Sequence, residues 1–500
     1  MADKVVIAGA GIGGLSAGIY ARMNGYDVDI YEAHTGPGGL CATWKRGEYL
    51  FDGCIHFLFG TIPGSSLYDF WNELGVFDKI ECCYHPEYLT VSPLDNKKIT
   101  IFKNASVLKE HLIDISPEDK GIITKFCDDI ISLASMPTDT YRIPPEMIHL
   151  PAAGEYLAGA ASYLPLMREL CSTTLEQTFS KLKSSSIRDS LYYILPPQSS
   201  LFALCWTMAQ FHRGDGAWVK GGSLQLARAL ESRFMEVRGR IHYSSRVNAI
   251  QVAESKVNSI IVNDTDLIDC DILISAIDGH TALFELVDEK YRSIVLKEYY
   301  DRFEPISGIT QVSFGVDTDL SMYPHHECIE LEEPFIFAGR EVRHCIVRHY
   351  CDDPSMAPQG HSVVTSLLLT SFDFWEQYST NRIEYENVKQ QILEKIQKVV
   401  IKRYGLTSCN IVCSDVASPL THTRMTGVWR GAYNGWLHTP QNAFATIPKT
   451  LPGLKNMFFA GQWVAPGGGL PLAAVSGRWA VQLLQQRLKR DFHTCNKSRL

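Results

Sequence analysis

The chain has 500 residues, of which 45% are hydrophobic and 20% are charged. These shares are ordinary for a folded protein, and the length allows two or three domains with a large core. The formal net charge of -8 excludes a general basic field, so we expect no nucleic-acid partner.

The cysteine and apolar patterns predict a cytoplasmic protein. Met1 is followed almost at once by a strand-like apolar run, which leaves no space for a targeting peptide, and no apolar run reaches the roughly eighteen residues of a spanning helix. Without a secretion signal, most of the 14 cysteines are expected to be free thiols. The cluster from His325 to Cys328 and the pair His344 and Cys345 lack a familiar ligand spacing, so we expect no metal.

The first forty residues carry the strongest motif. An apolar run at residues 4–8 is typical of a buried strand, and it leads directly into the glycine sequence GAGIGG at 9–14. A helix is expected over 15–24 and a second strand over 27–31, which ends at Glu32. This order of strand, glycine turn, helix, strand and acid predicts a Rossmann-type dinucleotide site.

Each glycine position in this motif has a physical reason. Gly9 permits the tight turn after the strand, Gly11 allows the backbone to approach a pyrophosphate, and Gly14 allows the helix to pack against the strand. The helix N-terminus presents free N–H groups and the positive end of a dipole to the phosphates. The Glu32 carboxylate can accept hydrogen bonds from ribose hydroxyls.

The rest of the chain is expected to alternate between two domains. The strand and glycine-turn patterns of a nucleotide-binding domain occur in residues 1–60, 216–290 and 421–490. The apolar spacing in residues 61–215 predicts a helical lid or substrate domain. Strand-like stretches and a helix in residues 291–420 are assigned to the substrate domain. The predicted fold class is α/β, with a discontinuous Rossmann-like domain and a mixed α+β substrate domain.

The C-terminal segment supplies a second glycine-rich turn. Residues 456–461 are strand-like and end in a glycine, residues 462–469 form the turn, and a helix is expected over 470–488. The positive dipole end at the N-terminus of this helix would stabilise a nearby negative charge.

Taken together, these motifs resemble the phytoene desaturase-like flavoproteins of the amine oxidase superfamily. The matching residues are spaced along nearly the whole chain: Gly9 to Gly14, Glu32, Gly38-Gly39-Leu40, Phe51-Asp52-Gly53, Gly221-Gly222-Ser223, Ala460 to Trp463, Pro466 to Pro471 and Ser476-Gly477-Arg478. The segment 419–440 is also similar to bacterial members of the group.

The resemblance implies non-covalent FAD, with a defined set of contact residues. The expected contacts are Gly9, Gly11, Gly13 and Gly14 at the pyrophosphate, Glu32 at the ribose, Gly38, Gly39 and Leu40 at the pyrophosphate or flavin edge, Val247 at the adenine, and Gly461, Gln462 and Leu470 at the ribityl chain and isoalloxazine. Many relatives carry Arg or Lys where this chain has Leu40, so a phosphate contact from that side chain is not expected.

The resemblance implies hydride transfer at a carbon–carbon bond of an apolar polyene or isoprenoid, that is, desaturation. A saturase or a cis–trans isomerase that works from reduced FAD, a flavin amine oxidase, and a non-catalytic FAD-binding chaperone are the alternatives. A second dinucleotide fingerprint is missing, because Gly214 and Gly216 have no third glycine in register. We therefore expect an external electron acceptor or donor.

No residue is assigned as the catalytic acid or base. His56 could relay a proton or be structural, and Arg424 and Arg478 could contact ligand or form packing ion pairs. The aromatic residues expected either in the core or on a substrate wall are Phe57, Phe59, Trp206, Phe211, Trp375, Trp429, Tyr433 and Trp436. Residues 156–170 are apolar enough to dock on a bilayer as a peripheral contact, or to form a buried helix.

Overall fold

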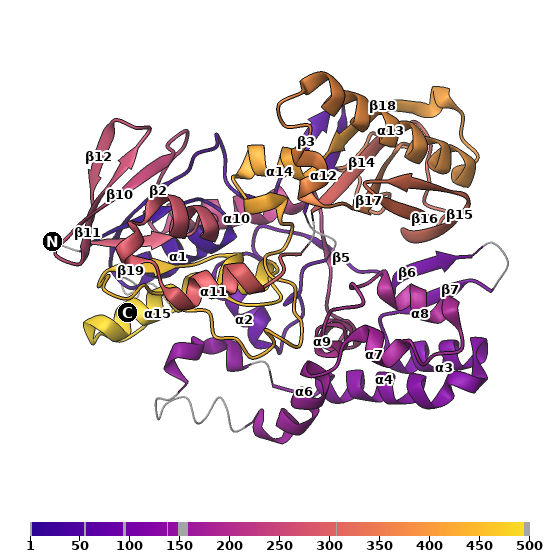
Figure 1. The fold of residues 1–500 in the computed structure, drawn as a ribbon, viewed down its shortest axis with the longest axis horizontal. Helices are drawn as coiled ribbons and strands as arrows, with labels where there is room; N and C mark the ends of the chain where they lie inside the picture. The colour runs from indigo at the N-terminus through magenta and orange to yellow at the C-terminus, as the bar shows by residue number, and fades with distance from the viewer. Residues whose placement is uncertain are drawn as a thin grey trace.

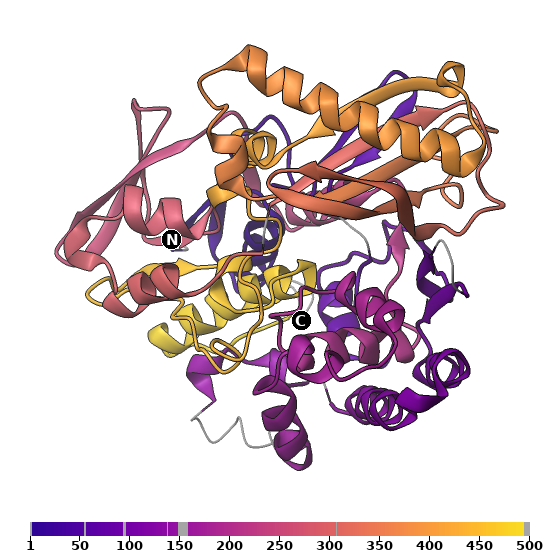
Figure 2. The same cartoon turned by 45° about the vertical axis from the view of Figure 1, so that its right-hand side comes forward.

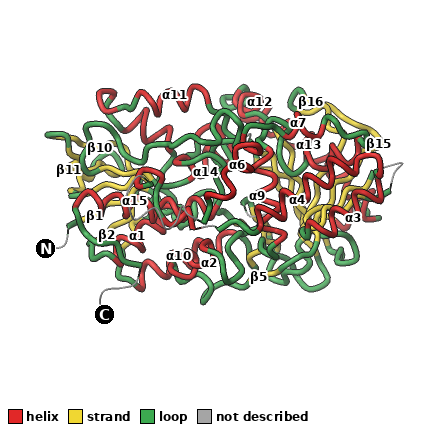
Figure 3. Tube along the Cα trace, turned by 90° about the horizontal axis from the view of Figure 1, so that it is seen from below, coloured by secondary structure: helices red, strands yellow, loops and turns green. Residues whose placement is uncertain are grey.

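The computed structural model describes residues 3–54, 57–93, 97–137, 139–148, 159–306 and 308–494. A five-stranded parallel sheet and a larger, mostly antiparallel sheet lie toward opposite ends of the long axis, and a layer of helices lies below them (Figure 1). In the view from below, β1 and α1 lie near one end and β15 and α3 near the other (Figure 3).

A five-stranded parallel sheet organises the first end of the molecule. Its strand order is β19-β13-β1-β2-β9. The bounds are β1 Lys4–Ala8, β2 Asp27–Tyr31, β9 Arg240–His242, β13 Ile272–Ser275 and β19 Met457–Phe459. Strands from three distant parts of the sequence therefore form one sheet, which is the arrangement expected of a discontinuous Rossmann-like domain.

The two faces of this sheet are covered by different layers, because alternate side chains of a strand point to opposite faces. Val5, Ile7 and Ile30 belong to one core cluster with α1 Ile12–Met23, α10 Ser223–Glu236 and α15 Leu470–Leu488. Val6 and Leu273 belong to another cluster, with β10 Val247–Ala253 and β11 Lys256–Val262. These two strands and β12 Asp266–Asp269 form a three-stranded antiparallel sheet.

A seven-stranded sheet forms the other end, in the order β18-β14-β17-β16-β15-β6-β7. The bounds are β6 Glu87–Ser92, β7 Ile99–Phe102, β14 Ile309–Val316, β15 His326–Phe337, β16 Arg340–His349, β17 Ser362–Leu369 and β18 Ile411–Ala417. The long helix α13 Arg382–Tyr404 lies across it (Figure 2) and buries Ile392, Ile396 and Val400. The mixed α/β fold class is thereby confirmed.

The helical pattern predicted for residues 61–215 is incomplete. This region contains β6 and β7, which join the seven-stranded sheet through a parallel pairing of β6 with β15. Burial alternates over only four residues of β7 and does not alternate along β6, so the strand pattern is weaker than the helical spacing around it. The strand that joins this pair to the larger sheet, β15, lies more than 200 residues away in the sequence.

The remaining elements connect these layers. The helices are α2 Ser66–Glu73, α3 Ala105–Ile115, α4 Lys120–Ala134, α6 Leu164–Cys171, α7 Leu175–Phe179, α8 Ser185–Tyr192, α9 Leu201–His212, α11 Ile294–Arg302, α12 Phe372–Glu376 and α14 Pro419–Thr426. The β3–β4 hairpin pairs Thr43–Arg46 with Tyr49–Asp52, and a separate antiparallel pair joins β5 Cys82–Cys83 to the distant β8 Trp218–Val219. Within the described ranges, none of the helices has the length and apolar character needed to cross a bilayer.

Candidate active site

The glycine turn after β1 opens onto a cavity of about 1600 Å³. Gly9 has a φ of +97°, a conformation that favours glycine, and its N–H donates to Tyr31 O at 2.8 Å. A Cβ at Gly11 would meet no atom within 4 Å, so this position faces open space. A Cβ at Gly14 would lie 2.0 Å from Gly9 O, which means that only glycine fits where α1 meets the strand.

Glu32 lies at the end of β2, beside the same turn. One carboxylate oxygen accepts from Ala10 N at 2.6 Å and the other from His34 N at 2.8 Å. A carboxylate has roughly four lone-pair positions, so two backbone donors leave acceptor capacity for a ligand. The carboxylate lines the cavity at its nucleotide-binding end.

The C-terminal turn closes the opposite wall of this end of the cavity. Gly461 has a φ of +109°, and a Cβ at Gly13 would lie 2.8 Å from Gly461 N. The two turns therefore approach each other at a distance that excludes side chains. Helix α15 begins after Gly469 without a side-chain cap, and Leu470 lines the cavity. The free N–H groups of its first turn can thus interact with a bound ligand.

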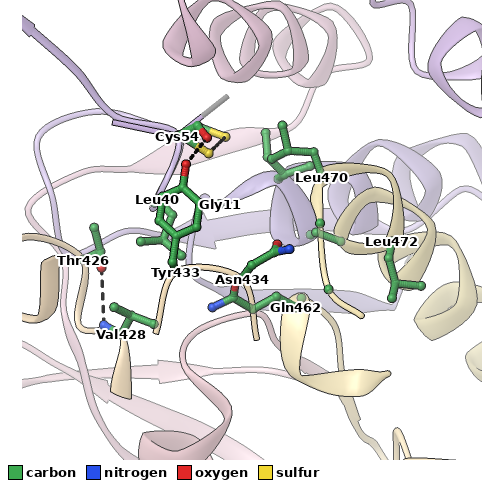
Figure 4. Close-up of a pocket in the computed structure, with 18 of the residues that line it drawn as sticks. Gly11, Leu40, Cys54, Thr426, Val428, Tyr433, Asn434, Gln462, Leu470 and Leu472 are labelled. Carbon is green, nitrogen blue, oxygen red and sulfur yellow. Dashed lines mark hydrogen bonds between the residues drawn. The ribbon is translucent and has the colours of Figure 1, made fainter. Parts of the chain in front are cut away.

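All of the predicted cofactor contacts except Gly14 line the cavity. They are Gly9, Gly11, Gly13, Glu32, Gly38, Gly39, Leu40, Val247, Gly461, Gln462 and Leu470. Several of them surround the same space in Figure 4, where Gly11 and Leu40 face Gln462 and Leu470. Gly14 lies behind the turn, because its lack of a side chain serves packing between α1 and β1.

Arg228 is a cavity-lining residue that the sequence analysis did not single out. It lies on α10, one helical turn after Leu224, and both residues line the nucleotide-binding end. The sequence did carry a signal for Arg228. A residue four positions after Leu224 lies on the same face of the helix that starts after Gly222. Arg228 can supply the positive charge that Leu40 lacks.

The other part of the cavity is an arm with apolar walls. Aromatic and aliphatic side chains line it: Phe57, Phe59, Tyr88, Met136, Tyr141, Ile194, Leu195, Phe202, Trp206, Leu472, Val475 and Trp479. Within the described part of the chain, the buried Ser199 Oγ and Trp206 Nε1 have no hydrogen-bond partner. Because both residues line the arm, these two groups can bind a polar substituent there.

The aromatic candidates divide between wall and core. Phe57, Phe59, Trp206 and Tyr433 line the cavity. Phe211 packs behind Phe57 and Phe59, at ring-centre distances of 4.8 and 5.2 Å. The remaining three, Trp375, Trp429 and Trp436, belong to core clusters or pack against them.

The charged candidates also separate. Arg424 lines the cavity, whereas Arg478 forms an ion pair with Glu73 inside the protein, among the rings of Phe70 and Tyr20. Arg478 is therefore a packing residue. His56 lies outside the described residues.

His438 lies where the arm meets the glycine turn. It lines the cavity, and its Cδ2 would be 3.7 Å from a Cβ at Gly467. Its Nδ1 is 2.7 Å from Ser200 Oγ, which leaves Nε2 as the nitrogen available to a ligand. Burial lowers the pKa of His438 to about 4, so the ring is neutral at pH 7 and Nε2 keeps its lone pair.

Asp278 is a half-buried acid at the cavity wall. Burial raises its pKa to about 6, although it accepts hydrogen bonds from the backbone N–H groups of Trp429, Thr281 and His280. These donors hold the carboxylate in place against the desolvation that favours its protonated form.

The comparisons with known proteins agree with this geometry. The model of the flavin-containing amine oxidoreductase family matches residues 12–485. The 4,4'-diaponeurosporene oxygenase of Staphylococcus haemolyticus (strain JCSC1435) is 25% identical over 95% of both chains. That of Staphylococcus aureus (strain Mu50 / ATCC 700699) is 24% identical over 97% of this chain and 99% of its own.

Solved structures share the fold. An oxidoreductase from Methanosarcina mazei has a TM-score of 0.59 and 16% identity, with 96% of this chain and 100% of that chain covered. A putrescine oxidase bound to putrescine has a TM-score of 0.60 and 14% identity, with 97% of this chain and 99% of that chain covered.

The chain belongs to the flavin-containing amine oxidoreductase family, and it is an FAD-dependent oxidoreductase. Two observations fit this cofactor. Gly11 leaves open space beside the N-terminus of α1, where a pyrophosphate can approach, and Glu32 keeps acceptor capacity at the same end of the cavity.

Proposed function

We propose that the enzyme acts on a carbon–carbon bond of an elongated apolar polyene, by desaturation. The observation that carries this proposal is one cavity whose glycine-lined end continues into an apolar arm. Its volume of about 1600 Å³ exceeds the roughly 300–1,000 Å³ of a typical small-molecule pocket, which supports room for FAD and a long substrate together. The names of the staphylococcal relatives also support a carotenoid-like substrate.

We propose that FAD occupies the glycine-lined end. Gly9, Gly11 and Gly13 would hold the pyrophosphate with the N-terminus of α1, with Gly14 packing the helix behind them, and Glu32 would bind the ribose. The other contacts would be Gly38, Gly39, Leu40, Val247, Gly461, Gln462 and Leu470. We also propose that the chain divides into the segments 1–60, 61–215, 216–290, 291–420 and 421–490, of which the first, third and fifth form the FAD-binding domain.

The residues of the arm would orient the substrate and exclude water. Bound FAD supplies a hydride acceptor. His438 Nε2 is the proton acceptor that we propose for the second hydrogen, because the neutral ring lies between the glycine turn and the arm. Phe202 is on the arm side of this ring, with ring centres 5.7 Å apart.

The lining favours a polyene over an amine. Among the described residues that line the cavity, the lysine is Lys389 on α13, whose Nζ is 3.5 Å from the Glu386 carboxylate. A flavin amine oxidase usually carries a lysine near N5 of the flavin ring. This lysine is instead held by neighbouring residues of its own helix.

The direct test is an anaerobic absorbance titration of the yellow holoenzyme. We expect a long polyene to bleach the oxidised-flavin band, and aliphatic amines to leave it unchanged. Ala203→Trp on α9 should fill the arm and abolish bleaching while FAD stays bound, because Ala203 lines the cavity. Val107→Trp, on the exposed face of α3, is the matched control. Bleaching of the wild-type flavin by aliphatic amines, or unchanged bleaching by polyene in Ala203→Trp, would overturn the proposal.

We further propose peripheral membrane contact next to the arm. Of the apolar segment 156–170, the residues through 158 lie outside the described ranges, but Leu164 on α6 is 45% exposed. Met167 on the same helix and the 40% exposed Ile148 line the cavity, which supports substrate entry at this surface. Liposome flotation tests it: wild type should float, and Leu164→Glu should stay at the bottom of the gradient. Equal behaviour of both proteins would refute the contact.

A further inference from the structure

Two cysteines face each other at the base of the β3–β4 hairpin. The strands pair Thr43 with Asp52, and Gly53 N donates to Ala42 O at 2.9 Å. Continuing this register by two positions sets Cys41 opposite Cys54, and their sulfur atoms are 3.8 Å apart. Opposite residues of antiparallel strands have Cα atoms about 4.5–5.5 Å apart, within the range that a disulfide bridges. The hairpin therefore brings the two thiols to a distance from which an S–S bond of about 2.05 Å can form with a small movement.

The pair lies in the wall of the cavity. Both Cys41 and Cys54 line it, and Cys41 directly follows Leu40. In Figure 4 the sulfur of Cys54 lies near Leu40 and Tyr433, whose hydroxyl donates to Cys54 O. The thiols thus border the end of the cavity that we assign to FAD.

The hydrogen-bond partners in this pair differ from those of other described cysteines. Cys345 and Cys351 have serine hydroxyls as hydrogen-bond partners, and Cys83 has the ring of His85. A sulfur–sulfur contact beside a redox cofactor allows different chemistry, because two thiols in contact can be oxidised to a disulfide.

The surroundings of Cys54 favour its protonated form. The hydrogen bond with Cys41, and then burial, raise the pKa of Cys54 well above its ordinary value. Cys54 therefore stays protonated, and either sulfur can be the donor of the hydrogen bond between them.

We propose that Cys41 and Cys54 form a two-electron thiol–disulfide couple that carries electrons between the flavin and an external disulfide. This inference rests on the proposed position of FAD. It provides the electron partner that the chain otherwise lacks, because the sequence carries no second dinucleotide fingerprint.

The electron balance follows the desaturation direction. The Cys41–Cys54 disulfide takes up two electrons and two protons from the reduced flavin, its S–S bond breaks, and two thiols form while the flavin returns to its oxidised state. One thiol of the pair then loses its proton and attacks an external disulfide, which forms a mixed disulfide and releases one external thiol. The other thiol of the pair displaces the second external thiol and restores the internal S–S bond.

The test uses the holoenzyme treated with glutathione disulfide and freed of excess reagent. Photoreduction with EDTA under anaerobic conditions reduces the flavin first, so any thiols that then appear have received their electrons through it. Alkylation and mass spectrometry should find Cys41 and Cys54 protected before illumination and alkylated after it. An anaerobic dithionite titration should consume about twice as much reductant per FAD in wild type as in Cys41→Ser or Cys54→Ser.

The control is Cys409→Ser, which removes an exposed thiol and should titrate like wild type. Equal dithionite uptake by wild type and both serine variants, or protected thiols that illumination leaves unchanged, would overturn the couple. Single-turnover bleaching by polyene separates this outcome from the proposed function. Bleaching that persists in the Cys41→Ser/Cys54→Ser double variant while the couple fails would leave the function standing, and an intact couple without bleaching would overturn the function alone.

Discussion

Gly11→Val should give a folded protein that cannot bind FAD. Gly11 has φ -71° and ψ 176°, an extended conformation that valine adopts readily. A Cβ there would meet no protein atom within 4 Å, so the new side chain projects into the cavity. The branched side chain would occupy the space through which a pyrophosphate approaches the turn.

The expected magnitudes separate folding from binding. Because the backbone fits and nothing clashes, we expect the free energy of unfolding of the apoprotein to change by less than about 1 kcal/mol. A gain of about 0.4–1 kcal/mol from reduced freedom in the unfolded chain is offset by the loss of a glycine cap on α1. Wild type at an FAD concentration of about 100 times its dissociation constant gains roughly 2.7 kcal/mol from binding, and the variant should lose this contribution. Apoproteins should therefore unfold alike, whereas added FAD should stabilise wild type alone.

The assay combines visible absorbance of the purified protein with thermal unfolding in the presence and absence of FAD. Gly14→Ala is the contrasting variant, because its Cβ would lie 2.0 Å from Gly9 O and should destabilise the apoprotein itself. A yellow Gly11→Val protein with FAD-dependent stabilisation would refute the assignment of this turn to the pyrophosphate. An unfolded Gly11→Val protein would refute the reasoning from open space.

Three further predictions concern buried polar groups. Asp52→Ala should lower the free energy of unfolding by roughly 3–5 kcal/mol, because the buried carboxylate accepts several hydrogen bonds that tie the β3–β4 hairpin to the start of α10. Urea unfolding of the apoprotein measures this loss. Glu73→Gln should cost a similar amount by leaving the Arg478 charge buried, and Arg478→Met in the same background should restore part of the loss. Burial lowers the pKa of His422 and His438 to about 4, so the unfolded chain binds more protons than the folded one, and the free energy of unfolding should fall as pH drops from about 6.5 toward 4. In a variant with both residues replaced by Asn, the free energy of unfolding should depend less on pH over this range. An unchanged pH dependence would contradict the assignment.

Local pattern predicted the parts of the FAD-type domain well. The strands at 4–8 and 27–31 and the helix at 470–488 have the predicted bounds, because a buried parallel strand is a short apolar run and a glycine turn marks its end. The helix predicted from residue 15 begins at Ile12, since Gly11 already serves as its cap. Strands β6 and β7 were missed, because they enter the seven-stranded sheet through the pairing of β6 with β15, which lies far away in the sequence.

The sequence by itself determined the cofactor class and the glycine positions, since backbone conformation and close approach at Gly9 and Gly14 allow no other residue. Only the tertiary structure decided which residues share the cavity. It brought Gly13 within reach of Gly461, joined the glycine-lined end to an apolar arm, and set Cys41 opposite Cys54. The physical reason is that such contacts arise from strand register and layer packing, which depend on segments that no local pattern connects.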